Sequence, residues 1–109
     1  MEAPVAAFKI FGSRPGGDLF EITVEVGMPV RVADTAEEWV CLYDVRPLEG
    51  GRFRVHGGSS FQALTLALRS TLRFLEDFRE SGGQLFYEPG VLFEFGPHLV
   101  TLRHPNGDA

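Results

Sequence analysis

The stretch that decides the fold is GGSSFQALTLALRSTLRFLEDFRESGG, residues 57–83. Its apolar residues recur at steps of three and four, which is the spacing of one face of an α-helix. The stripe consists of Phe61, Leu64, Leu68, Leu72 and Leu75, widened along one side by Ala67, Phe74 and Phe78. Gly82 and Gly83 end the pattern, because glycine readily adopts the left-handed conformation that terminates helices. We therefore predict one amphipathic helix over residues 60–81.

The glycines and serines before this helix have two interpretations, a loop that binds an anion or a helix start. Backbone amides at a helix N-terminus can bind anions, but the Lys-Ser or Lys-Thr pair of the phosphate-binding loop and the three spaced glycines of the dinucleotide-binding loop are both absent. Ser59 is followed three residues later by Gln62, which is the pattern of a capping box. We predict that Ser59 and Gln62 form a structural cap worth about 1 kcal/mol.

The residues before the helix show the period-two alternation of β-strands. The clearest strand covers residues 20–26, and Gly27-Met28-Pro29 interrupts it because proline cannot donate to a strand ladder. Further strands are predicted at residues 5–11, 38–46 and 52–56. The strand 38–46 is apolar on both faces, with Trp39, Cys41, Tyr43 and Val45 on one and Val40 and Leu42 on the other, which is typical of a central strand.

After the helix, three short apolar segments are separated by Pro89-Gly90 and Gly96-Pro97. We predict short strands at residues 84–88, 91–95 and 98–103, followed by a frayed tail over residues 104–109. Strands followed by a helix, without regular alternation, favour an α+β fold. The expected architecture is a single domain over residues 1–109. It contains an antiparallel sheet meander of four strands, one long helix packed across it and the short C-terminal strands.

Composition narrows the classes of function. The 109 residues carry a net charge of −5, so the chain as a whole does not attract a nucleic acid backbone. The single cysteine, Cys41, cannot form an internal disulfide and suits a reducing cytoplasm. Neither a secretion signal nor a membrane-spanning run is apparent. We predict a cytoplasmic protein that binds neither nucleic acid nor membrane.

The residue types that usually carry catalysis or bind metals are scattered. The three histidines, His56, His98 and His104, lack the close spacing of a metal site. Cys41 lies on a face that should be buried, where cysteine behaves as a small apolar residue rather than a nucleophile. Glu21 and Glu25 should lie about 13 Å apart along one strand, too far for a glycosidase pair. We therefore predict no catalytic residues, no metal and no cofactor.

Several of these residues together resemble a family of small uncharacterised bacterial proteins, classed only as a domain of unknown function. The similar motifs are a Gly-x-Pro after a strand (Gly27–Pro29), a Trp-x-Cys strand (Trp39–Cys41) and a Gly-x-Asp-x-x-Gln-Ala-Leu helix start, matched here by Gly57–Leu64. The resemblance covers roughly residues 20–80. The family's Asp is Ser59 here, and both are good N-caps. The resemblance implies the same architecture and brings no activity with it.

Two functional classes remain open. The first, which we favour, is a non-catalytic protein-interaction module, for which an immunity or antitoxin-like role would suit the size and charge. The alternative is a small enzyme or ligand-binding domain with a pocket between helix and sheet. One helix can cover only one face of a sheet, so the apolar second face predicts a two-fold homodimer. The alternative is that the C-terminal third of the chain closes over that face. The candidate interface residues are Trp39, Val40, Leu42, Leu66, Phe74 and Phe78.

Overall fold

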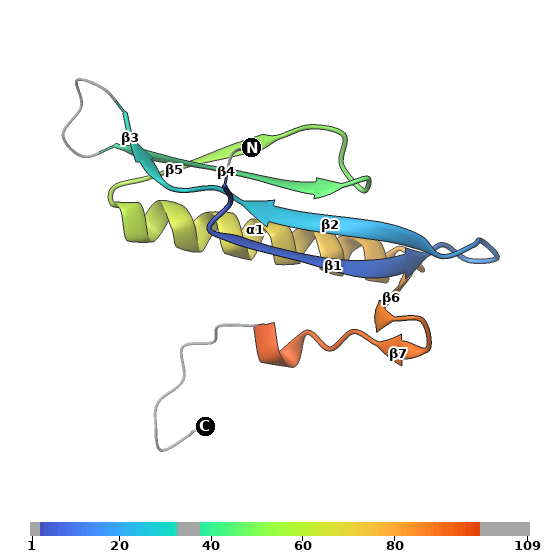
Figure 1. Cartoon of the computed structure of the whole chain (residues 1–109). Coiled ribbons are helices and arrows are strands. Elements are labelled where there is room, and N and C mark those ends of the chain that lie inside the picture. The colour runs from blue at the N-terminus through green and yellow to red at the C-terminus, as the bar shows by residue number, and fades with distance from the viewer. Residues whose placement is uncertain (1–2, 33–37, 99–109) are drawn as a thin grey trace, which may run out of the picture.

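A β-sheet and one long helix form two layers (Figure 1). A computed structural model describes residues 3–32 and 38–98, and within these ranges the sheet has seven strands. The elements in chain order are β1 (Ala6–Ser13), β2 (Phe20–Val26), β3 (Val30–Arg31), β4 (Trp39–Arg46), β5 (Phe53–Gly57), α1 (Ser60–Glu80), β6 (Gln84–Glu88) and β7 (Val91–Leu92). All pairings are antiparallel. The predicted α+β class and the single long helix are confirmed.

The spatial order of the strands is β5-β4-β2-β1-β6-β7, so β1, β2, β4 and β5 form the expected meander. The additional strand β3 lies on the same edge of β4 as β2: Val26 pairs with Tyr43, and Val30 pairs with Val40. The break between β2 and β3 is the predicted interruption at residues 27–29. A two-residue strand is too short to show an alternation, so β3 was not predicted.

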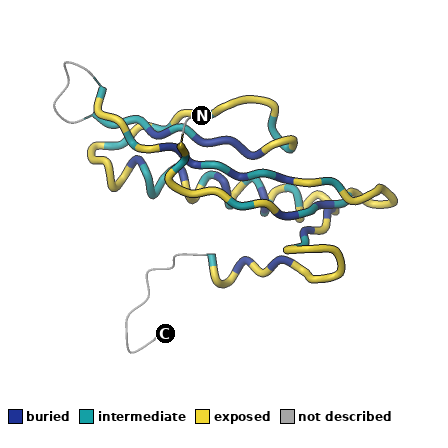
Figure 2. Tube along the Cα trace, in the orientation of Figure 1, coloured by how far each residue is buried: buried dark blue, intermediate teal, exposed yellow. Residues whose placement is uncertain are grey.

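The core lies between the sheet and α1, where Figure 2 shows buried positions on the central strands and on one side of the helix. One cluster of buried residues joins Ile10, Ile22, Val24, Val45, Leu75, Leu85, Phe93 and Phe95, and a second joins Val26, Cys41, Tyr43, Ala63 and Ala67. Alternate residues of β1, β2 and β4 therefore point toward the helix. The burial of Cys41 agrees with its predicted role as a small apolar residue.

The buried side of α1 differs from the predicted stripe. The helix buries Ala63, Ala67, Thr71 and Leu75, whereas Phe61 is 79% exposed and Leu68 is 38% exposed. The prediction of Phe61 and Leu68 as core residues was wrong. The residues of α1 that face the sheet are instead mostly small. The helix backbone approaches the sheet closely at Gly57, and long side chains on this side of the helix would keep the two layers apart.

The C-terminal segment also differs from the prediction. Strand β7 ends at Leu92, and the chain then runs back below β1 in the view of Figure 1. Phe93 stacks with Phe8 at a centroid separation of 6.2 Å, and the guanidinium of Arg79 lies 4.3 Å from the ring centre of Phe95. The segment 91–95 is therefore mostly a cover for the core.

Beyond this segment, residues 96–98 form a short 3-10 helix, where the predicted strand 98–103 was to begin. The rest of that strand, the predicted tail 104–109 and His104 lie outside the described residues.

Candidate functional site

One face of the sheet is left uncovered by the helix, and we call it the open face. Directly paired residues point to the same side of a sheet, so the pairing of β4 with its neighbours identifies its members. At one end, Val30, Val40 and His56 form one row and Leu42 pairs with Arg54. At the other end, Glu25 pairs with Asp44, and Lys9, Thr23 and Arg46 form a further row. The open face thus has an apolar end and a charged end.

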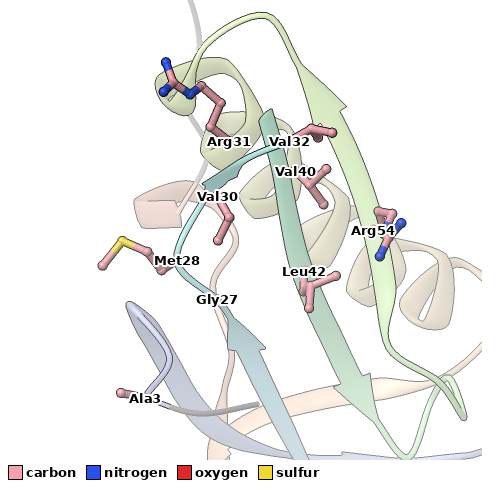
Figure 3. A pocket seen from close by; sticks show the side chains of 9 residues that line it. All are labelled: Ala3, Gly27, Met28, Val30, Arg31, Val32, Val40, Leu42 and Arg54. Carbon is pink, nitrogen blue, oxygen red and sulfur yellow. The ribbon is translucent and has the colours of Figure 1, made fainter. Parts of the chain in front are cut away.

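The apolar end contains a hollow of about 490 Å³ (Figure 3). It is lined by Ala3, Gly27, Met28, Val30, Arg31, Val32, Val40, Leu42 and Arg54. The break after β2 makes this hollow: the Gly27 N–H still donates to the Leu42 carbonyl at 2.8 Å, and the chain then leaves the ladder until Val30. Met28 and Val30 are 65% and 60% exposed, so the hollow is bordered by apolar side chains that remain in contact with water.

The predicted interface residues divide between the two faces. Val40 and Leu42 line the hollow, as their place in the strand pattern predicted. Trp39 packs, half-buried, against the cluster on the helix side, and Leu66 is half-buried on α1. Met28 and Val30 were not selected from the sequence, although Gly27-Met28-Pro29 was the signal that could have identified them.

Phe74 and Phe78, also predicted as interface residues, are half-buried and pack against the core clusters. The ring of Phe74 lies 5.1 Å from that of Phe53 and 6.2 Å from that of Tyr43. Phe78 meets Phe20 edge-on at 5.9 Å. Both rings fill space between the helix and the sheet, because the small residues of α1 leave gaps beside them.

Ion pairs cover the charged end of the open face. The Asp44 side chain is only 4% exposed, and its carboxylate lies 3.6 Å from Arg46 Nε and 3.8 Å from Arg52 Nε. Arg46 also reaches Glu25 at 3.5 Å, and Lys9 lies 3.9 Å from Glu21. At the apolar end, His56 Nδ1 is 2.7 Å from Glu38 Oε2. Within the described residues, Arg54 has no carboxylate at ion-pairing distance.

The described residues do not bring a nucleophile and a base together. Cys41 pairs with Val55 and Val40 pairs with His56, so Cys41 and His56 point to opposite faces of the sheet. Cys41 Sγ donates to the Gly27 carbonyl at 3.3 Å, and burial raises the pKa of the thiol. No group of three His, Cys, Asp or Glu side chains that could hold a metal ion occurs in residues 3–32 and 38–98.

Ser59 is the N-cap of α1. The Gln62 N–H donates to Ser59 Oγ at 3.0 Å, and the Gly58 N–H donates to Gln62 Oε1 at 2.5 Å. The Gln62 side chain therefore reaches the amide of Gly58, one residue before the one expected in a capping box. These two amides are already bonded within the chain, so they are not available to an anion.

The comparisons with known proteins give no assignment. No family model, curated protein or solved structure matches this chain. The resemblance to an uncharacterised bacterial family therefore stays a prediction. In the part of the chain that is described, no helix is long and apolar enough to cross a membrane.

Proposed function

We propose that this protein is a non-catalytic protein-interaction module, and that two copies pair through the open face to form a two-fold dimer. The observation that carries the proposal is the apolar end of that face, where Met28 and Val30 are exposed beside Val40 and Leu42. Burying such side chains contributes about 25 cal/mol per Å² of apolar surface. Two-fold dimers are the commonest oligomers and bury the same patch on both copies.

Charge supports a second copy as the occupant. Among the described residues, the open face and its border carry five cationic side chains, Lys9, Arg31, Arg46, Arg52 and Arg54, and four acidic ones, Glu21, Glu25, Glu38 and Asp44. The chain as a whole has a net charge of −5. The open face has nearly balanced charges, so two copies of an acidic protein can meet there without strong repulsion.

The position of the hollow favours this role over the enzyme or ligand-binding alternative. That alternative expects a pocket between helix and sheet, whereas the hollow lies on the opposite face. Ligand pockets usually bury most of a small molecule, but Met28 and Val30 at its border are themselves more than half exposed. A free thiol at Cys41 further supports placement in the reducing cytoplasm.

Sedimentation equilibrium at micromolar concentration tests the dimer. The wild-type protein should have about twice the chain mass of 12.1 kDa. Val30→Asp should sediment as a monomer, because a charged carboxylate would have to lose its water at the centre of an apolar interface. Val91→Asp and Phe61→Asp are matched controls, since they place the same charge at exposed apolar positions on β7 and α1. Both controls should remain dimeric.

A wild-type mass of 12.1 kDa that does not rise on concentration would refute the dimer. Monomers produced by Phe61→Asp, with Val30→Asp still dimeric, would move the interface to the helix.

A further inference from the structure

Strand β5 lies at the edge of the sheet, and in the described residues β4 is its only strand partner. Gly27 donates to the Leu42 carbonyl and Val32 donates to that of Glu38, so even-numbered residues along β4 direct their backbone groups toward β2 and β3. The odd-numbered residues of β4 therefore bond to β5, because successive residues of a strand alternate in this respect. Their partners in β5 are Phe53, Val55 and Gly57.

It follows that the backbone N–H and C=O groups of Arg54 and His56 point away from the sheet. Both residues are exposed, and β5 is regular over its five residues. A free edge of this kind can accept a further strand from another polypeptide. Its reach is about five residues, because the chain turns into α1 directly after Gly57.

Side-chain charge indicates what kind of strand fits. Arg54 and His56 are flanked by Arg52, and alternate residues of a strand share a face. Arg52 has a counter-charge in Asp44, and His56 bonds to Glu38. Arg54 is the member of this row that lacks a carboxylate partner among the described residues. A strand added beside β5 would place its own side chain directly opposite Arg54, at cross-strand distance.

The same row argues against a second copy at this edge. In a two-fold pairing of β5 with β5, the residues whose backbone groups point outward would have to face one another. The register centred on Val55, which overlaps all five residues of β5, sets Arg54 opposite His56, and the register centred on Arg54 sets two arginines opposite each other. Like charges directly opposite are destabilising. Cations on an edge strand are a recognised protection against self-pairing. The same cations would attract a strand that carries acidic side chains.

We propose that the free edge of β5 binds an extended acidic segment of a different protein by strand addition. The backbone groups of Arg54 and His56 would form the new ladder, and Arg54 would pair with a carboxylate of the segment. Arg54 also lines the hollow at the apolar end of the open face. The new ladder, however, would use the outward backbone groups of the β5 edge rather than the open face itself, so the proposal does not require the dimer.

The test uses a seven-residue peptide of alternating valine and glutamate, which presents its carboxylates on one face of an extended strand. Titration into the full-length protein, followed by amide chemical shifts, should perturb Arg54 and His56 most strongly. A peptide with lysine in place of glutamate should bind at least about fivefold more weakly. A glutamate peptide N-methylated at the amides that face β5 should not bind, because it keeps the charge and loses the ladder.

Charge reversal supplies the specific control. Arg54→Glu should lose the preference for the glutamate peptide and gain one for the lysine peptide. Arg69→Glu on the exposed side of α1 makes the same change in net charge and should leave both affinities unchanged. Arg54→Gln, which removes the charge without reversing it, provides a second variant if Arg54→Glu does not fold, and it should abolish the preference for glutamate.

Three results would overturn the proposal. The first is that the glutamate peptide does not bind at millimolar concentration. The second is that the N-methylated peptide binds as tightly as the unmodified one. The third is that Arg69→Glu weakens binding of the glutamate peptide as much as Arg54→Glu does.

Discussion

Gly57 and Ala63 are in contact through their backbones: a Cβ built on Gly57 would lie 2.6 Å from the Ala63 amide nitrogen. This contact is where α1 turns back against β5, three residues after the helix begins. It brings the helix close enough for Ala63 and Ala67 to pack onto Cys41 and Val26. The position of the helix over the sheet, and hence the identity of the open face, depends on it.

The first prediction is that Gly57→Ala destabilises the protein by about 1–3 kcal/mol, because the added methyl group collides with helix backbone that cannot move independently. Urea denaturation measures the change. Gly50→Ala is the matched control, since a Cβ there meets nothing within 4 Å, and its effect should stay within about 0.5 kcal/mol. Equal stabilities for the two variants would show that the layers can separate without cost.

The second prediction concerns the cap of α1. Ser59→Ala should lower the free energy of unfolding by about 1 kcal/mol, because the Gln62 amide loses its acceptor. Ser59→Asp should be tolerated, since aspartate also accepts this bond and its charge suits a helix N-terminus. Thermal melts of the two variants give the comparison. A loss of stability in Ser59→Asp as large as that in Ser59→Ala would contradict the capping role.

The third prediction tests which side of α1 is buried. Leu75→Ala should cost about 2–5 kcal/mol, because Leu75 is fully buried in the main cluster and its truncation leaves a cavity. Phe61→Ala removes a larger side chain but should change stability by no more than about 0.5 kcal/mol, because Phe61 is exposed. Chemical denaturation of both variants distinguishes this helix orientation from the stripe expected by spacing alone. The opposite ranking would restore that stripe.

The fourth prediction concerns Cys41. A thiol reagent should label the native protein much more slowly than the unfolded protein, because the side chain is inaccessible and its raised pKa disfavours the reactive thiolate.

The same shift makes stability depend on pH. A group whose pKa is higher in the folded chain contributes fully below its unfolded value and loses that contribution as pH rises through the folded value. Stability should therefore fall above about pH 9, the ordinary value for the thiol. Cys41→Ala should show a weaker decline over this range, and an identical decline would assign it to other groups.

Local patterns in the sequence were sufficient to predict most elements of the fold. The strand at residues 20–26 was predicted with the bounds that it has, and the helix was predicted to within one residue. Alternation and the three-to-four spacing depend on backbone geometry within a few residues, as does the bond between Ser59 and Gln62. The sequence also predicted the second apolar face of β4, formed by Val40 and Leu42, because the residues of a strand alternate between its two faces.

The tertiary structure alone decided how these elements meet. The spacing of apolar residues defines a stripe on the helix but not how the helix is rotated against the sheet. The close approach at Gly57 places small residues of α1 against the sheet and leaves Phe61 in solvent. The hollow brings Met28 and Val30 beside Val40 and Leu42, although the two pairs are about ten residues apart in sequence. The free edge of β5 exists because of its place in the strand order. These features arise from contacts between distant segments, whose geometry no local pattern encodes.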